Sequence, residues 1–120
     1  MEFVHFAAGI VGAIHLVFAL VEAFFWGLAT KKLTTFGHDP RIVAATKPLG
    51  QNFAIYNLLV GVGLFATYWL NEAVQADVQV WVLSSIAIAG GVAGLTLKGW
   101  LLPVLQGVVP ALSAVLLLVG

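Results

Sequence analysis

Four long apolar stretches, separated by short polar segments, make up almost the whole chain. They cover residues 3–28, 49–70, 78–97 and 101–119. Each is close to the roughly 20 apolar residues that an α-helix needs to cross the hydrocarbon of a bilayer. The pattern therefore predicts an all-α fold: a polytopic membrane protein, built as a compact bundle of four transmembrane helices, with residues 1–120 as a single membrane domain.

The composition supports the same class of protein. Hydrophobic residues make up 62% of the 120 residues and charged residues 8%, against about 45–50% and 25% in soluble domains. So few charges leave a small chain without a polar surface, which excludes a soluble enzyme. Five positive and five negative residues balance, so no basic field exists for nucleic acid. Cysteine is absent, which excludes disulfides and thiolate-bound metals.

The basic residues predict the orientation in the membrane. All five lie in the segments that precede the second and the fourth span: Lys31, Lys32, Arg41, Lys47 and Lys98. The segment between the second and third spans holds only acidic charges. The positive-inside rule then places the loop of residues 29–48 in the cytoplasm and both termini outside, in a plasma or bacterial inner membrane.

The tryptophans fit this arrangement, since each lies at the end of a predicted span: Trp26, Trp69, Trp81 and Trp100. Tryptophan favours the headgroup level of a bilayer, so their simplest interpretation is that of interface anchors.

The long first loop has its own local signals. Asp39 and Pro40 are typical of a helix N-cap followed by a first-turn proline. They predict one or two helical turns over 41–46 at the membrane surface, and Pro48 is expected to start the second span.

Two ionisable side chains lie inside the first span, where such groups are expensive and are functional candidates by default. His15 and Glu22 are seven residues apart, which is nearly two turns of helix, so both lie on one face, roughly 10 Å apart along the axis. The three histidines of the chain lie at different depths, so no metal or cofactor site is predicted.

The other spans add polar side chains at about the depth of Glu22, in the half expected to face the cytoplasm. The opposite half offers few. The predicted ligand-binding set is His15, Glu22, Trp26, Asn52, Tyr56, Asn57, Thr96 and Gln106. The alternative for its uncharged members is structural, because polar side chains also join membrane helices, at about 0.6 kcal/mol each. Pro110 in the fourth span removes a backbone donor, which frees the carbonyl of Gln106.

Small residues mark the expected helix contacts. Gly90 and Gly94 form a G-x-x-x-G pair in the third span, a pattern that lets helix backbones approach closely. A homodimer through this face is therefore a candidate assembly.

Four short motifs resemble a known family, the small membrane proteins catalogued as "domain of unknown function 1304". They are IHLVFALVEAFFW with His15 and Glu22, QNFAIYN with Asn52 and Tyr56, AGLTLK, and LQGVVPAL. One difference is that Phe53 and Ala54 follow Asn52, where the family often has Gln-Gly. The resemblance spans nearly the whole chain and implies a four-helix membrane protein of about this length. It implies no activity.

Three hypotheses about function remain open. The first is binding or transport of a small molecule through the polar pocket around Glu22. The second is a membrane-embedded enzyme acting on a lipid or isoprenoid, with His15 and Glu22 moving protons. The third is an accessory subunit, whose glycine faces would meet a larger membrane complex.

Overall fold

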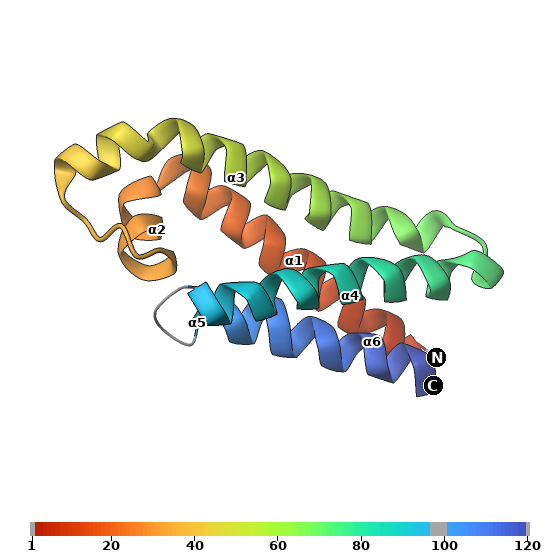
Figure 1. Cartoon of the computed structure of the whole chain (residues 1–120). Helices are drawn as coiled ribbons and strands as arrows, with labels where there is room; N and C mark the ends of the chain where they lie inside the picture. Colours follow the sequence, from red (N-terminus) through yellow and green to blue (C-terminus); the bar gives the residue numbers. More distant parts are fainter. Residues whose placement is uncertain (1, 97–100, 120) are drawn as a thin grey trace.

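The computed structural model describes residues 2–96 and 101–119, and all regular structure within them is helical. Two long helices form one layer: α1 (Glu2–Phe24) and α3 (Pro40–Ala66) pack along most of their length. The second layer pairs α4 (Glu72–Thr96) with the last helical stretch, α5 (Leu101–Pro103), a π-helical turn (Val104–Val108) and α6 (Val109–Val119) (Figure 1). The all-α prediction is confirmed.

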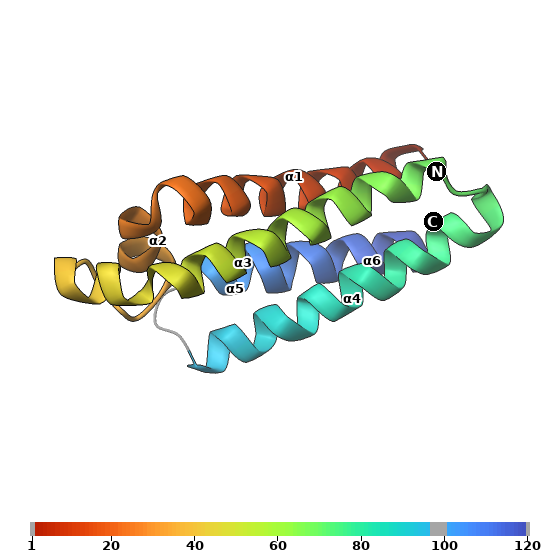
Figure 2. The same cartoon turned by 90° about the horizontal axis from the view of Figure 1, so that it is seen from above.

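The bundle is long and narrow, with extents of 50 × 26 × 17 Å. α1 begins and α6 ends at one end, here called the termini end (Figure 1). The opposite end, the loop end, carries the short helix α2 (Trp26–Leu33) and the segment that joins it to α3. The view from above shows that α3 and α4 meet at the termini end and diverge toward the loop end (Figure 2).

Three helical stretches in the described part of the chain are long and apolar enough to cross a membrane: His5–Phe24, Pro40–Trp69 and Glu72–Ala93. The last stretch, Val104–Val119, is apolar but shorter. Four helical stretches thus build the bundle, as expected.

Two predicted boundaries near the loop end are wrong. The first span was expected to run through to residue 28, but α1 ends at Phe24 because Phe25 leaves the helical region, with φ −131° and ψ 48°. The second span was expected to start at Pro48. Instead α3 starts at Pro40 and passes through Pro48 without a break. Pro48 removes only the hydrogen bond to the carbonyl of Ala44, which lies on an exposed turn where water can replace it.

The third span also starts earlier than expected, at Glu72 rather than residue 78. Asn71 explains the difference, because its side-chain Oδ1 accepts a hydrogen bond from the backbone N–H of Val74 at 3.2 Å and caps the helix. The expected cap of α3 is present: Asp39 Oδ1 accepts from Arg41 N–H at 2.9 Å, and Pro40 is the first helical residue.

Glycines allow the closest helix contacts. A Cβ on Gly61 would lie 2.7 Å from the Leu16 side chain and 2.9 Å from the carbonyl oxygen of Gly12. A Cβ on Gly90 would lie 2.3 Å from the backbone of Gln106 and Gly107. Gly90, expected at a dimer face, is therefore used within the chain, and the side-chain position of Gly94 lies outside the described residues.

Candidate functional site

A cavity of about 360 Å³ lies at the loop end of the bundle, between α1, α2, α3 and the π-helical turn. Its volume is within the range of small-molecule sites. Most of its lining is apolar or aromatic. The lining residues are Phe18, Glu22, Trp26, Ala29, Leu33, Thr34, Thr35, Phe36, Phe53, Tyr56, Asn57 and Gln106. We call this space the Glu22 cavity.

Glu22 provides the acidic group of this cavity. It lies in the last turns of α1, and only 8% of its surface is exposed. The side-chain amide of Asn57, on α3, donates a hydrogen bond to its Oε1. That bond joins the two helices and fixes one carboxyl oxygen, while the cavity adjoins the rest of the group.

Trp26 forms an aromatic wall. The break at Phe25 lets α2 turn, so that the indole lies flat against the backbone at Gly50, where a Cβ would lie 2.4 Å from the ring. The indole Nε1 donates to Thr46 Oγ1 at 3.0 Å, and the ring of Phe53 meets the indole edge-on with centroids 6.3 Å apart. Trp26 is buried, so its interpretation as an interface anchor is wrong. Trp69 and Trp81 are 84% and 72% exposed, as expected for such anchors.

Gln106 approaches the cavity from the other layer, on the π-helical turn. Val109 N–H bonds to the carbonyl of Val104, five residues earlier, which widens the helix at this point. Pro110 follows, and its ring cannot donate to the carbonyl of Gln106. The Gln106 side chain makes no hydrogen bond to the residues that the structure describes, so its amide is available to a ligand.

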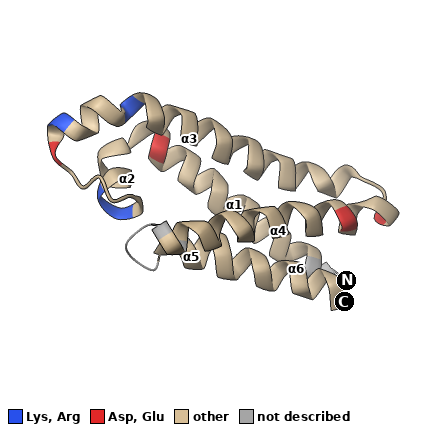
Figure 3. Cartoon of the chain, viewed as in Figure 1, with Lys and Arg blue, Asp and Glu red and all other residues tan. Residues whose placement is uncertain are grey.

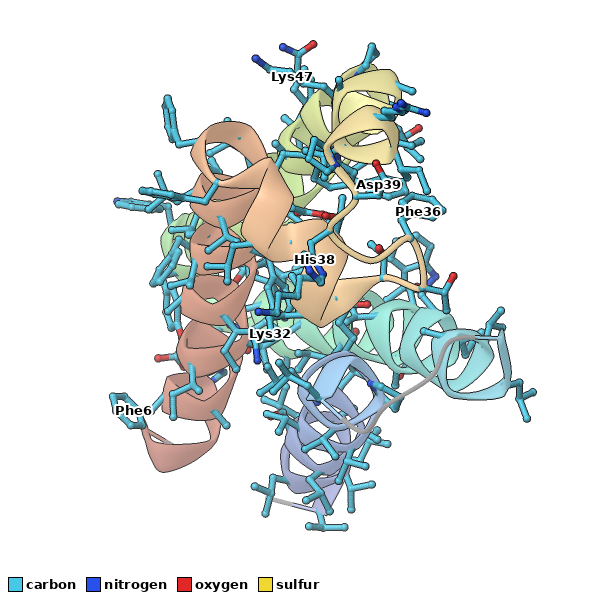
Figure 4. All side chains as sticks on the ribbon, turned by 90° about the vertical axis from the view of Figure 1, so that its left-hand side faces the viewer. Phe6, Lys32, Phe36, His38, Asp39 and Lys47 are labelled. Carbon is cyan, nitrogen blue, oxygen red and sulfur yellow. The ribbon has the colours of Figure 1, made fainter. Side chains whose placement is uncertain are left out.

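The segment between α2 and α3 borders the cavity at its outer side. Thr34 Oγ1 donates to the carbonyl of Thr30 at 2.7 Å and accepts from Phe36 N–H at 3.1 Å, which turns the chain back. Gly37 has φ +76°, a conformation that favours glycine. Figure 4 looks onto this end, with Phe36, His38 and Asp39 along the segment.

All described Lys and Arg residues gather at one end of the bundle, whereas acidic residues occur at both ends (Figure 3). The described Lys and Arg residues lie on α2 and the first part of α3, all at the loop end, whereas the acidic residues Glu72 and Asp77 lie at the termini end (Figure 3). Within the Glu22 cavity, however, the described lining includes no Lys, Arg or His. The carboxyl group thus lies at the same end of the bundle as the described basic residues, but none of them lines its cavity.

The structure brings five of the eight predicted ligand-binding residues to one cavity: Glu22, Trp26, Tyr56, Asn57 and Gln106. His15 is buried beside it, and its Nδ1 donates to the carbonyl of Val11 at 2.9 Å. Its ring meets the edge of Phe18, so it supports the wall rather than lining it. Asn52 is exposed and lies outside the lining. The side chain of Thr96 lies outside the described residues.

Sequence reasoning missed the aromatic and hydroxyl part of the site: Phe18, Leu33, Thr34, Thr35, Phe36 and Phe53. Phe18 gave a usable signal, because it lies four residues before Glu22 and therefore on the same helix face. The residues of the segment before α3 gave none, since their approach depends on the break at Phe25.

A second set of polar side chains lies at the termini end, where few were expected. His5 Nδ1 donates to Gln79 Oε1 at 2.8 Å, and Gln79 Nε2 donates to Thr67 Oγ1 at 2.8 Å. Thr67 in turn donates to the carbonyl of Leu64 at 2.6 Å. Gln79 is fully buried and Thr67 is 4% exposed. We call this set the His5–Gln79 network. It was missed because residues 71–77 were taken as a loop, which placed Gln79 at the very start of a span.

The fold and the cavity define a small all-helical membrane protein with a carboxyl-containing pocket at one end of its bundle. The chain belongs to the family described as "Protein of unknown function (DUF1304)", which matches residues 9–119. This confirms the resemblance found in the motifs. The chain matches no curated protein and no solved structure. Among the described residues, no group of three His, Asp or Glu side chains is placed to hold a metal ion.

Proposed function

We propose that the protein binds a small organic cation in the Glu22 cavity. The observation that carries the proposal is a buried carboxyl group that adjoins an empty volume and has an amide, not a basic residue, as its partner. A charged group buried in a membrane protein is stabilised by an opposite charge. A ligand ammonium beside Glu22 would supply that charge.

The aromatic wall supports the same ligand chemistry. Trp26, Phe53 and Tyr56 line the cavity together with Phe18 and Phe36. Cations are attracted to the faces of aromatic rings, and the attraction is strongest for Trp and for desolvated sites. The free amide of Gln106 adds a hydrogen-bonding group for a ligand that also carries a polar substituent.

The charges of the loop end favour a position of the cavity near the cytoplasmic face of the membrane. The cavity lies at the loop end, which holds the described Lys and Arg residues. The positive-inside rule favours the cytoplasm for that end. The structure favours binding over the enzyme hypothesis, because His15, the expected proton-transfer partner of Glu22, does not line the cavity.

The test uses 2-phenylethylamine, a soluble aromatic amine small enough for the cavity, with the purified full chain in detergent. Ligand-observed saturation-transfer NMR should show binding, and the neutral analogue 2-phenylethanol should bind at least about tenfold more weakly, since bonds to charged groups contribute roughly 1.5–3 kcal/mol. Glu22→Gln should weaken amine binding to the same extent.

Glu72→Gln is the matched control, because it makes the same change at an exposed glutamate of α4 at the other end of the bundle. It should leave amine binding unchanged. No binding to the wild-type chain, or equal binding to wild type and Glu22→Gln, would reject the proposed function.

A further inference from the structure

A second hollow lies next to the Glu22 cavity, where α3 and α4 diverge. It has a volume of about 600 Å³ and lies between the faces of Leu59, Val60 and Gly63 on α3 and Trp81, Val82 and Ile86 on α4. All but Gly63 carry apolar side chains of substantial size. We call it the α3–α4 cleft. It lies between two stretches that are long and apolar enough to cross a membrane, so in a bilayer it would adjoin the hydrocarbon.

Tyr56 belongs to the lining of both spaces. Asn57, its neighbour, bonds Glu22 across the cavity. Successive helix residues are about 100° apart, so Asn57 faces α1 while Tyr56 lies at the edge between the cavity and the cleft. Tyr56 is 64% exposed, and its side chain is not held by a hydrogen bond to the described residues. The cleft and the cavity therefore meet at the Tyr56 side chain, which no hydrogen bond within the described part of the chain fixes between them.

From this shared boundary we propose that the bound cation is a membrane-borne alkylamine that enters sideways from the bilayer. This inference rests on the proposed function of the Glu22 cavity. The ammonium group lies beside Glu22, the chain passes Tyr56, and the hydrocarbon tail fills the α3–α4 cleft. From Tyr56 to Gly63 the cleft extends roughly 10 Å along α3, at about 1.5 Å per residue, which is suited to a chain of medium length.

The charged and amide groups lie in the Glu22 cavity and the apolar side chains line the α3–α4 cleft, as a ligand with an ammonium group and a hydrocarbon tail requires. The carboxyl group and both amides, of Asn57 and Gln106, lie in the cavity, whereas the polar groups of the cleft are two hydroxyl groups, of Tyr56 and Ser85, and the indole N–H of Trp81. Ser85 Oγ already donates to the carbonyl of Trp81 at 2.8 Å. An apolar tail beside Ser85 thus leaves that hydroxyl group bonded within its own helix.

The variant Gly63→Leu tests the tail site without a steric clash in the protein, because a Cβ at Gly63 meets no atom within 4 Å. The leucine would project into the cleft. Gly91→Leu is the matched control, since Gly91 is also open and lies outside the cleft lining. Thermal unfolding of both variants in detergent verifies that they fold.

The experiment measures displacement of 2-phenylethylamine by hexylamine, octylamine and decylamine, with the chain in lipid nanodiscs so that partitioning is the same for all variants. In wild type and Gly91→Leu, affinity should rise with chain length. In Gly63→Leu, decylamine should bind at least about tenfold more weakly, as expected for two or more methylenes expelled at roughly 0.8 kcal/mol each, while 2-phenylethylamine binding stays the same.

Decanoate and decanol carry a tail of the same length without the positive charge, and neither should displace the amine. Displacement by decanol equal to that by decylamine would overturn the inference, as would equal decylamine affinity in Gly63→Leu and wild type. A change in oligomeric size in Gly63→Leu would show that a second copy occupies the cleft and would also overturn it. Each of these results leaves 2-phenylethylamine binding in place, whereas loss of that binding in wild type rejects the proposed function itself.

Discussion

The two ends of the bundle treat polar side chains in opposite ways. In the His5–Gln79 network each side chain has its partner within the chain, from His5 through Gln79 and Thr67 to the carbonyl of Leu64. At the loop end Glu22 has one amide partner, Gln106 has none among the described residues, and a cavity separates them. Polar groups satisfied internally join helices, whereas those left facing a cavity can serve a ligand.

The largest expected effect concerns the close contact between α4 and the π-helical turn, which borders the Glu22 cavity. In Gly90→Ala the new Cβ would lie 2.3 Å from backbone atoms of the π-helical turn, which cannot move aside without shifting the helix. Overpacking of this kind costs about 1–3 kcal/mol. We expect a clear fall in the thermal unfolding temperature, measured by circular dichroism in detergent, together with loss of amine binding.

Gly91→Ala provides the control for that change, because its Cβ meets nothing within 4 Å. It should unfold within a degree or two of wild type. Equal stability of the two variants would mean that α4 does not pack against Gln106 and Gly107 as described.

The second prediction compares the two ends directly. Gln79→Leu removes the partner of the half-buried His5 ring and one of the two hydrogen bonds of the Thr67 hydroxyl group, which costs about 1–3 kcal/mol. Glu22→Gln removes a charge whose burial is itself expensive and keeps an oxygen for Asn57. We therefore expect Gln79→Leu to lower the unfolding temperature with no effect on amine binding, and Glu22→Gln to have the reverse pattern. If both variants are destabilised equally, the distinction between the two ends is wrong.

The third prediction concerns the aromatic wall. Gly50→Ala would place a Cβ 2.4 Å from the indole of Trp26 and push the ring toward the cavity. Amine binding should weaken several-fold, and the tryptophan emission spectrum should shift as Trp26 changes its surroundings. Gly27→Ala is the control, because its Cβ would meet only the Val43 side chain, at an ordinary 3.8 Å. An unchanged spectrum in Gly50→Ala would contradict the position of Trp26.

The smallest effect is expected at the bond that orients this wall. Thr46→Val removes the acceptor of the Trp26 Nε1 hydrogen bond, and such bonds contribute about 0.6 kcal/mol on average in membrane proteins. Stability and amine affinity should each fall slightly, up to about threefold in affinity. Thr46→Ser keeps the hydroxyl group and should restore both. A Ser variant that behaves like Val would show that the methyl group matters rather than the bond.

The sequence predicted the fold class well because long apolar stretches specify membrane helices almost by length alone. It also predicted the core of the candidate site, since Glu22 and Asn57 are costly in lipid. The predicted helix boundaries were wrong where a tertiary contact, rather than the local sequence, determined where a helix ends. One example is the break at Phe25, where the sequence has neither Gly nor Pro. The break occurs together with the packing of Trp26 on Gly50. Asn52 does not line the cavity because it lies on an exposed face of α3, and the sequence did not indicate which face of α3 turns toward α1.

The π-helical turn has a consequence for the evolution and engineering of this fold. Such a turn contains one more residue than the α-helical turn it replaces. The last helical stretch therefore holds one residue more than an unbroken α-helix of the same length. Because the wider turn accommodates its extra residue locally, deleting one residue from Val104–Val108 would convert the turn to an α-helix and leave the helix on either side of it on its original face. The last stretch can thus change which side chain it presents at the position of Gln106 by a single insertion or deletion, while α6 keeps its packing on α4.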